Sequence, residues 1–289
     1  MLGFLQYKNT YLEQLVAVYD KDHACTVLGW LCEKATGKSL TFLMVTPSAF
    51  NEQHEKQIAE WVGKIVSEHY PLQYILETIS FGPLTLRVEE PVLIPRPETE
   101  EWIYNVLHSL KSYKDESLSI LDLCTGSGCI ALAAAHYFKN AHVDAVDLYE
   151  KPLELTSKNA RLNECNNVQV IQSDLFSELA GKHYDIILSN PPYIDEMVWQ
   201  TLSPTVKNWE DKNALVADNT GLALYERIIE DAPQFLKKDS VLKNVAQIYL
   251  EIGYDQGSAV TQLLQHAGFA SVTVHKDFAG HDRMVNALL

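Results

Sequence analysis

A short run of polar and proline residues, Ser189-Asn190-Pro191-Pro192-Tyr193, contains the residue types in this chain that are best suited to chemistry. It follows Tyr184 to Leu188, an apolar run that predicts a buried strand. A residue before proline is restricted to extended conformations, and each proline fixes φ and removes a backbone donor. The result is a stiff turn with two hydrogen-bond acceptors, the Asn190 side-chain oxygen and a backbone carbonyl, beside the ring of Tyr193. Such a turn suits a planar NH2 group of an amide or an amine.

Prolines after a strand commonly only end it, so this turn indicates a reaction only if a second site lies in the same domain. Ser119 to Gly128 predicts that second site, because a strand breaks into a loop with two glycines and strong helix formers follow from Ile130. Gly126 and Gly128 let the backbone turn tightly and approach a ligand, and the helix N-terminus presents free N–H groups. A second predicted strand ends in Asp147, whose carboxylate can accept the ribose hydroxyls of a nucleoside.

The glycine loop on its own is consistent with three kinds of site. It fits a methyl-donor loop, while Gly126-x-Gly128-x-x-Ala131 also satisfies the dinucleotide fingerprint, and a glycine turn can exist without any ligand. Asp174 follows a third predicted strand at 168–171 and favours the methyl donor, because an acid there can accept the amino group of adenine. A nicotinamide enzyme has no use for the Asn-Pro-Pro-Tyr turn. The residues therefore indicate a site for S-adenosylmethionine.

Composition limits the class of partner and the compartment. The 289 residues are enough for about two domains, and no apolar run is long enough to span a membrane. The N-terminus lacks a signal-peptide pattern, and five cysteines without C-x-x-C spacing indicate reduced cytoplasmic thiols and neither zinc nor disulfides. The net charge of −15 disfavours DNA, because nucleic-acid enzymes need a basic surface, and fits a basic protein substrate better.

The pattern of predicted elements divides the chain into three parts. Residues 1–78 are helical in pattern, and the clearest helix covers 52–68, where apolar residues recur every three or four positions. Residues 79–98 predict a short hairpin followed by a stiff proline-rich connector. Residues 99–289 alternate strands and helices, which predicts a parallel sheet covered on both faces.

Ligands of such sheets bind at the carboxyl ends of the strands. Four candidate residues each follow a predicted strand: Gly126, Asp147, Asp174 and Asn190. We therefore expect them to converge on one crevice.

Longer motifs connect the chain to one family. They are Pro71-Leu72-Gln73-Tyr74, Val92 to Glu100, Asp122 to Gly128, Ser189 to Ile194, Leu250 to Gly253 and Asp277 to Arg283. Asn-Pro-Pro-Tyr alone is shared with enzymes that methylate amino groups of DNA. The Ile-Pro-Arg-Pro-Glu-Thr-Glu connector resembles that of the release-factor glutamine methyltransferases, which are protein-(glutamine-N5) methyltransferases. The chain is similar to this family over nearly its whole length from Pro71 onward.

The resemblance implies a fold and an activity. The fold would be α/β, a Rossmann-like seven-stranded class I S-adenosylmethionine-dependent methyltransferase domain with a small N-terminal helical domain, for substrate docking, and a connecting β-hairpin. The activity would be methylation of N5 of the glutamine in the Gly-Gly-Gln motif of class 1 peptide chain release factors, which supports translation termination. S-adenosyl-L-methionine would be converted to S-adenosyl-L-homocysteine. We expect no direct nucleic-acid or membrane partner, no metal, a cytoplasmic location and a monomer.

Carried over by position, the resemblance also implies roles for particular residues. The catalytic residues would be Asn190, Pro191, Pro192 and Tyr193. The donor would be bound by Cys124, Thr125, Gly126, Ser127, Gly128, Asp147, Asp174, Leu175 and Asn190. The loop 124–128 would hold the amino-acid end of the donor, Asp147 its ribose, and Asp174 with Leu175 its adenine. Family members often have glycine where Cys124 stands, an exchange that requires a negative φ, and Glu77 likewise replaces a usual glycine.

Two other classes of function remain open. An amino-methyltransferase acting on DNA adenine or on a small molecule would share the same site. A non-catalytic S-adenosylmethionine-binding protein would keep Gly126 and Asp147 but would tolerate loss of the Asn190 side chain. Arg96, Glu98 and Glu100 have two interpretations: they support the crevice or bind substrate, or they form a solvated salt bridge in the connector.

Overall fold

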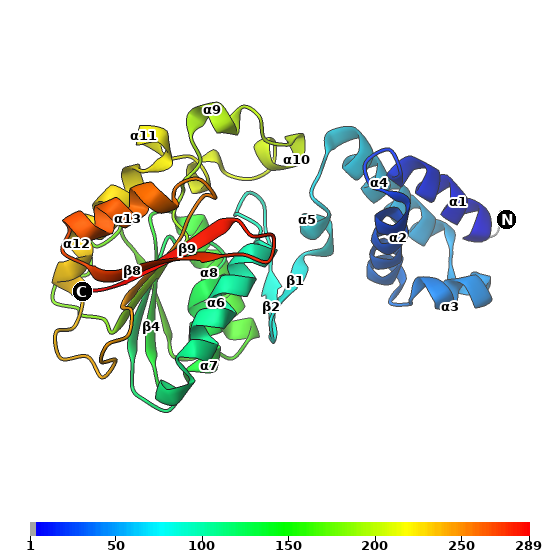
Figure 1. Cartoon of the computed structure of the whole chain (residues 1–289). Helices are drawn as coiled ribbons and strands as arrows, with labels where there is room; N and C mark the ends of the chain where they lie inside the picture. Colours follow the sequence, from blue (N-terminus) through cyan, green and yellow to red (C-terminus); the bar gives the residue numbers. More distant parts are fainter. Residues whose placement is uncertain (1–3) are drawn as a thin grey trace. The chain divides into compact units, whose positions relative to one another are not determined.

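The structure, a computed structural model, describes residues 4–289 and separates into two compact units (Figure 1). One unit contains the described residues up to Thr78 together with Ser203–Trp209, and the other contains Ile79–Leu202 and Glu210–Leu289. Within the described chain, no helix combines the length and the apolar character needed to cross a bilayer.

The first unit is a bundle of helices around its own apolar core. Its elements are α1 (Phe4–Leu15), α2 (Lys21–Thr36), α3 (Leu40–Val45), η1 (Pro47–Ala49), α4 (Glu52–Glu68), α5 (Leu72–Leu76) and α10 (Pro204–Lys207). In α4, Ile58, Val62 and Ile65 recur on one buried face, and the Asn51 side chain caps the helix by accepting from two backbone N–H groups. The helix predicted at 52–68 therefore has the bounds of α4.

Trp209 attaches the short segment Ser203–Trp209 to this bundle. Its indole Nε1 donates a hydrogen bond to the carbonyl of Glu68 at 3.0 Å. Its ring packs edge-on against Tyr70, with 4.6 Å between the centroids. A segment distant in sequence thus becomes part of the first unit through one aromatic residue.

Glu77 ends α5 in the left-handed conformation, with φ 66°. Glycine adopts this conformation without strain, whereas a residue with a Cβ is strained in it. Lys34 donates to the Glu77 carboxylate and to the carbonyl of Leu76, so the glutamate keeps the backbone geometry of glycine and adds an ion pair.

The second unit is built on a sheet that, within the described residues, has seven strands in the order β5-β4-β3-β6-β7-β9-β8 (Figure 1). The strands are β3 (Ser119–Leu123), β4 (His142–Asp147), β5 (Val168–Gln172), β6 (Ile186–Ser189), β7 (Ile248–Glu251), β8 (Ala270–Lys276) and β9 (Asp282–Leu288). Pairing is parallel from β5 to β7, as predicted, but β9 runs antiparallel to both of its neighbours. The prediction of a parallel sheet was therefore wrong for β9. Only a short turn separates β8 from β9, and a short turn joins antiparallel strands.

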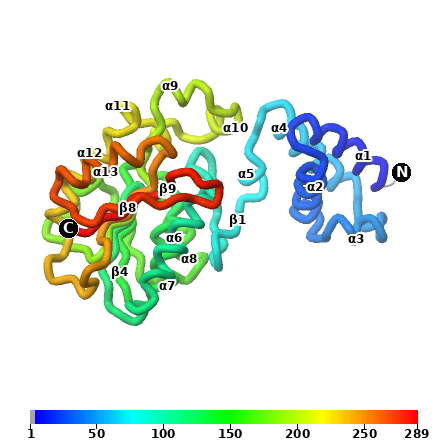
Figure 2. The backbone as a smooth tube through the Cα atoms, viewed as in Figure 1, coloured from blue at the N-terminus to red at the C-terminus, as the bar shows by residue number. Residues whose placement is uncertain are grey.

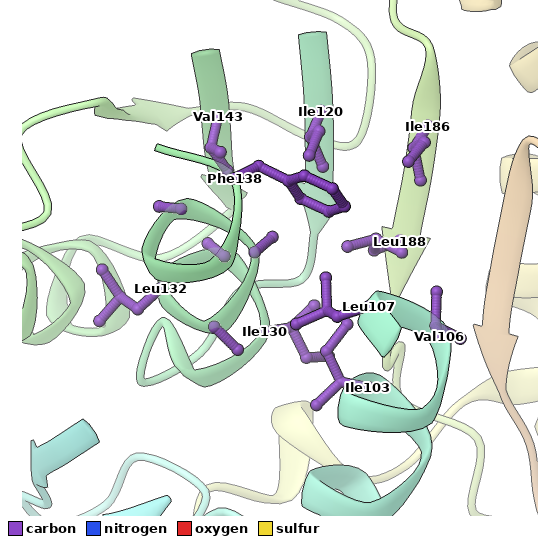
Figure 3. Packing of buried hydrophobic residues seen from close by; sticks show 14 of the residues in the cluster. Ile103, Val106, Leu107, Ile120, Ile130, Leu132, Phe138, Val143, Ile186 and Leu188 are labelled. Atoms are coloured by element: carbon purple, nitrogen blue, oxygen red, sulfur yellow. The ribbon is translucent and has the colours of Figure 1, made fainter. Parts of the chain in front are cut away.

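Helices cover both faces of this sheet, and the backbone tube shows their paths around it from the same side as the ribbon (Figure 2). On one face lie α6 (Pro97–Ser109), α7 (Cys129–Tyr137) and α8 (Glu150–Leu162), and on the other lie α12 (Ala223–Phe235) and α13 (Gly257–His266). Figure 3 shows Leu107 of α6 and Ile130 of α7 packed toward Ile120 and Leu188 of the central strands. The remaining elements are β1 (Thr78–Phe81), β2 (Leu84–Arg87), η2 (Lys111–Tyr113), α9 (Glu196–Trp199), η3 (Lys212–Ala214) and α11 (Asp218–Gly221).

The strand order reverses between β3 and β6, at the centre of the sheet. Leu123 and Ser189, the last residues of these two strands, are register partners, and Ser189 Oγ donates to the Leu123 carbonyl at 2.8 Å. Open α/β sheets bind ligands beyond the carboxyl ends of the strands at such a reversal. The glycine loop and the Asn-Pro-Pro-Tyr turn therefore begin side by side.

Two asparagines, one in α8 and one directly after it, attach the β2 strand to the rest of the second unit. Asn159 is fully buried; its Oδ1 accepts from the N–H of Arg87 at 2.7 Å, and its Nδ2 donates to the carbonyls of Arg87 and Ser127 at 3.1 and 2.9 Å. One turn later, Asn163 makes two hydrogen bonds with the backbone of Thr85, at 3.0 and 2.8 Å. Because Ser127 lies in the glycine loop, Asn159 connects the hairpin to that loop.

We predict that Asn159→Ala lowers the free energy of unfolding by roughly 2–4 kcal/mol, because one buried and two part-buried backbone hydrogen bonds are lost and each unsatisfied buried group costs about 1–3 kcal/mol before relaxation. Asn163→Ala, directly after the same helix, is the matched control. Its partners are closer to solvent, so it should cost only about 1 kcal/mol. Urea denaturation of the variants measures both values, and equal losses would contradict the prediction.

Candidate functional site

A cavity of about 860 Å³ lies beyond the carboxyl ends of the central strands, within the second unit. This volume is in the range of small-molecule sites, about 300–1,000 Å³. The predicted site residues in its wall are Cys124, Gly126, Asp147, Asp174, Leu175, Asn190 and Pro192. The structure thus brings together the four residues that follow separate strands. Residues 211–214, residues 216–218 and the α12 residue Arg227 also belong to the wall.

The other predicted residues are absent from the described wall of this cavity: Thr125, Ser127, Gly128, Pro191 and Tyr193. Gly128 has φ 85°, and a Cβ on it would lie 2.9 Å from the Thr156 side chain, so the start of α7 requires glycine. The Thr156 hydroxyl also donates to the carbonyl of Gly126 at 3.0 Å. Gly128 and Thr156 therefore help to fix the shape of the loop.

Asp122 anchors the glycine loop from inside the sheet. Its Oδ2 accepts from the Thr125 hydroxyl at 2.6 Å and from the N–H of Ala131 at 3.1 Å, so one carboxylate oxygen connects the loop to the first turn of α7. Its Oδ1 is buried and meets no hydrogen-bond donor among the described residues. Burial raises the pKa of this carboxyl to about 7. Sequence reasoning did not single out Asp122, although an acid inside an otherwise apolar strand is an unusual signal.

Cys124 has φ 58°, so the condition of a negative φ, under which cysteine would replace glycine without strain, is not met. The chain must turn at once where β3 ends, because the next N–H, that of Thr125, bonds to the carbonyl of Val146 at 2.9 Å. A side chain in this left-handed region is strained, so glycine would fit this position better than cysteine. Burial raises the pKa of the Cys124 thiol, so the group stays protonated and acts in packing.

Asp147 places a carboxylate in the cavity wall. Its Oδ2 accepts from the N–H of Gly126 at 3.0 Å, and its Oδ1 accepts from the N–H of Tyr149 at 3.1 Å. Burial raises the pKa of this group, against those hydrogen bonds. A carboxylate oxygen can accept about two hydrogen bonds, so each oxygen can take one more donor, as two ribose hydroxyls would supply.

Asp174 forms an ion pair that the sequence did not predict. Its Oδ1 lies 2.8 Å from Nη2 of Arg227, and both side chains are half-exposed. Arg227 comes to the cavity through the packing of α12, which no local pattern predicts. The neighbouring Leu175 has φ 50°, an uncommon conformation for a bulky residue.

The Asn-Pro-Pro-Tyr turn is closed from two sides. Gln256 Nε2 donates to the Tyr193 carbonyl at 2.9 Å, while Gln256 Oε1 accepts from the N–H of Gly253 at 2.9 Å. Gly221 has φ 82°, and a Cβ on it would lie only 2.0 Å from the same carbonyl oxygen. Only glycine fits there, so the position of the turn is fixed by its surroundings.

Behind the turn, a buried carboxylate collects hydrogen bonds from several side chains. Glu251 Oε2 accepts from the Thr99 hydroxyl and from Trp102 Nε1, each at 2.7 Å. Glu251 Oε1 lies 3.4 Å from the hydroxyl of Tyr193. Thr99 in turn meets Asn190 Nδ2 at 3.3 Å. Sequence reasoning did not assign Thr99 and Glu251 a role in the site, although both lie in the motifs that carry the family resemblance.

Arg96 forms an ion pair whose partner is buried, so the pair is not the solvated salt bridge of the second interpretation. Its Nη2 lies 2.8 Å from both oxygens of Glu210, whose side chain is buried. Burial raises the pKa of Glu210, and Arg96 opposes that shift. Glu100 accepts from the N–H of Gly82 at 3.0 Å and so holds the hairpin turn. These residues therefore fix the connector.

The residues of the cavity fit a cationic nucleoside. A Cβ added at Gly126 would meet no atom within 4 Å, so the loop leaves open space beside the wall. Asp147 has spare acceptor capacity, and Asp122 keeps an unpartnered oxygen beneath the loop. The chemistry of this donor set suits S-adenosylmethionine. Across residues 4–289, no group of three or more His, Cys, Asp or Glu side chains is arranged to hold a metal ion.

Comparison with known proteins gives consistent similarities. Residues 106–205 match the family model of the methyltransferase small domain. The release factor glutamine methyltransferase of Bacillus cereus is 39% identical over 261 residues, which cover 89% of this chain and 89% of that protein. That of Fusobacterium nucleatum is 37% identical over 82% of this chain and 65% of its own length. A methyltransferase structure from Pyrococcus furiosus, at 17% identity, covers 80% of this chain and 96% of its own with a TM-score of 0.51, which supports the fold.

The strain at Cys124 gives a stability prediction. Cys124→Gly should be more stable than Cys124→Ala by about 0.5–1 kcal/mol, because relief of about 1–2 kcal/mol of left-handed strain exceeds the backbone entropy of glycine, roughly 0.5–1 kcal/mol. Cys129 is the control, since it begins α7 in a helical conformation. There alanine should be the more stable replacement, by about 1 kcal/mol. Urea denaturation of the four variants measures which replacement is more stable at each position. If the same replacement is the more stable at both positions, the prediction of strain at Cys124 is contradicted.

The raised pKa of Asp122 predicts a pH dependence of stability. The folded-state pKa of about 7 lies above the usual aspartate value of 3.8, so the folded protein binds more protons between these values and becomes less stable as pH rises. Asp122→Asn should remove this slope, which is at most about 1.4 kcal/mol per pH unit. We expect the variant to gain stability relative to the parent between pH 5 and 7, measured by urea denaturation. Parallel profiles for the two proteins would rule out this assignment.

Proposed function

Because the chain belongs to the release factor glutamine methyltransferase family, we propose that it transfers a methyl group from S-adenosylmethionine to a glutamine side-chain amide nitrogen, N5, of a class 1 peptide chain release factor. The family predicted from the sequence motifs is confirmed by these relatives. The target would be the glutamine of the Gly-Gly-Gln motif, the product S-adenosyl-L-homocysteine, and the biological role the support of translation termination.

The observation that carries this proposal is the place of Asn190. It follows Ser189, the register partner of Leu123, so its amide starts directly beside the glycine loop. It also lines the same cavity as Gly126, Asp147 and Asp174. An amide-binding turn and a nucleoside-binding loop on one cavity support methyl transfer between the two ligands.

The donor would lie along the wall formed by the first three strand ends. Loop 124–128 would hold its amino-acid end, Asp147 would accept its ribose hydroxyls, and Asp174 with Leu175 would line its adenine. When bound, S-adenosylmethionine supplies an electrophilic methyl group on a positively charged sulfur. The residues of this chain contribute binding and orientation to the reaction.

A glutamine amide nitrogen is a poor nucleophile, because its lone pair is conjugated with its carbonyl. Asn190 Oδ1 and the Pro191 carbonyl, as acceptors, would orient the NH2 group and stabilise the positive charge that develops on it. Fixed dipoles of this kind in a site without water are commonly the largest catalytic term. No strong base is required, since the methylated nitrogen is acidic while it carries the charge. Positioning of the two ligands within one cavity would supply the rest of the rate enhancement.

The choice of a protein substrate is supported by charge. A net charge of −15 opposes binding to nucleic acid and favours a basic protein surface. The helical unit up to Thr78 would dock the release factor, while the hairpin and linker at 79–98 would connect it to the catalytic residues 99–289. Since release factors act in translation, we propose a cytoplasmic enzyme that works as a monomer without nucleic-acid or membrane partners.

Asn190→Ala should lower kcat by about 10²–10³, the loss measured when one preorganised polar group is removed from an active site. The donor affinity should fall much less, because Gly126, Asp147 and Asp174 remain. Turnover and calorimetric donor binding measure the two quantities. Asn105→Ala, on the exposed face of α6, is the control and should keep both values.

The direct test is mass spectrometry of a purified release factor after incubation with the enzyme and the donor. We expect the mass of one added methyl group on the Gly-Gly-Gln glutamine. Methylation of DNA or of a small molecule in place of the release factor would favour the first alternative class. Donor binding without turnover on any of these substrates, together with tolerance of Asn190→Ala, would favour a binding protein.

A further inference from the structure

The amide of Asn190 is nearly symmetric in shape, yet only one of its two branches can accept a hydrogen bond. Nδ2 donates and Oδ1 accepts, so a rotated amide would present NH2 where the proposed mechanism needs an oxygen. The turn residues do not decide between the two orientations, because prolines 191 and 192 restrict only the backbone. A neighbour must therefore select the orientation.

A chain of hydrogen bonds leads from Asn190 to the buried end of β7. Asn190 Nδ2 meets Thr99 Oγ1 at 3.3 Å, and Thr99 Oγ1 meets Glu251 Oε2 at 2.7 Å. Both Thr99 and Glu251 are buried, at 1% and 2% exposure, so water is excluded from the bond between them, whereas the bond from Asn190 to Thr99 is part-buried. Trp102, one turn after Thr99 on α6, contacts the same Oε2 at 2.7 Å.

The direction of this chain follows from the chemistry of its members. The Trp102 indole N–H can only donate, so Glu251 Oε2 is an acceptor. Thr99 gives its single hydroxyl proton to that oxygen and therefore offers Asn190 a lone pair. A lone pair is satisfied only by the NH2 branch, so Nδ2 faces Thr99 and Oδ1 lies on the opposite branch.

We infer that Thr99 and Glu251 are positioning residues that orient the Asn190 amide so that its oxygen serves as the acceptor for the substrate nitrogen. This inference rests on the proposed function for its catalytic consequence, whereas the orientation itself does not depend on the substrate. Further contacts hold Glu251 in place. The Tyr225 hydroxyl donates to its backbone carbonyl at 2.7 Å, and Tyr193 approaches Oε1.

Burying a charge is expensive, so a carboxylate at this depth is poorly suited to attaching α6 to the sheet alone. Thr99 and Trp102 could be held by apolar packing instead. A charged acceptor, however, polarises both donors and gives the chain one direction.

The orientation is tested first without substrate, by NMR of the Asn190 side-chain amide. Its two N–H signals are assigned by their absence in Asn190→Ala. In the parent enzyme, one proton should exchange slowly with solvent because it is bonded to Thr99. In Thr99→Val, which keeps the volume and removes the hydroxyl, this protection should be lost. Equal protection in both proteins would overturn the inference.

Kinetics on the release factor test the consequence. Thr99→Val should lower kcat by about 10–100-fold, as losses of partners behind catalytic ligands do, with donor affinity unchanged. Thr99→Ser should restore most of the rate. Glu251→Gln should also stay active, because its carbonyl oxygen can replace Oε2 under both donors, whereas Glu251→Leu should not. Thr99→Ala replaces the valine variant if the latter does not fold.

A double-mutant cycle separates positioning from a purely structural role. In an Asn190→Ala background, Thr99→Val should cause no further loss, because the group it orients is absent. A loss as large as that in the parent background, or a parallel fall in donor affinity and stability, would overturn the inference. An inactive parent enzyme would instead refute the proposed function, and the NMR result would still decide the orientation.

Discussion

The parallel register between β3 and β6 is the constraint on which the rest of the site depends. Leu123 faces Ser189 at the last position of the two strands, and the serine hydroxyl bonds to the leucine carbonyl at 2.8 Å. A shift by one residue would turn every side chain to the other face of the sheet. Because both strands are buried on both faces, such a shift would exchange the side chains that pack against the two helix layers, so the core itself fixes how the glycine loop and the turn face each other.

Around this register, the backbone leaves ordinary conformations at several points near the cavity. Cys124 and Leu175 both have a positive φ, and Gly221 approaches the Tyr193 carbonyl too closely for any side chain. Strain of this kind persists only where surrounding contacts determine the conformation. At the glycine loop, Asp122 provides such contacts by accepting from Thr125 and from the N–H of Ala131, and Asn159 does so by donating to the carbonyl of Ser127.

Local patterns predicted much of the fold but only part of the site. The helix at 52–68 and the central strands could be read from periodicity, because burial of one face or of a whole strand leaves a regular pattern. The reversal of β9 and the φ of Cys124 could not, since pairing partners and turn geometry decide them. The Asp174–Arg227 pair joins residues from separate elements, and so does the Thr99–Glu251 contact. Such pairs depend on packing in three dimensions, which the spacing of residues along the chain does not predict.

The last of these contacts bears on how an enzyme can act on an amide at all. The proposed substrate is a glutamine side chain, whose oxygen and nitrogen branches are as similar in shape as those of Asn190. Two amides can pair in either of two orientations, and only one orientation places the glutamine nitrogen against an acceptor. Shape alone cannot make this choice, so a fixed polarity must come from a group without such symmetry. A carboxylate has only acceptors, and an indole N–H only donates. In this chain Glu251 and Trp102 supply that fixed polarity, and Thr99, which is hydrogen-bonded to both Glu251 and Asn190, orients the asparagine accordingly.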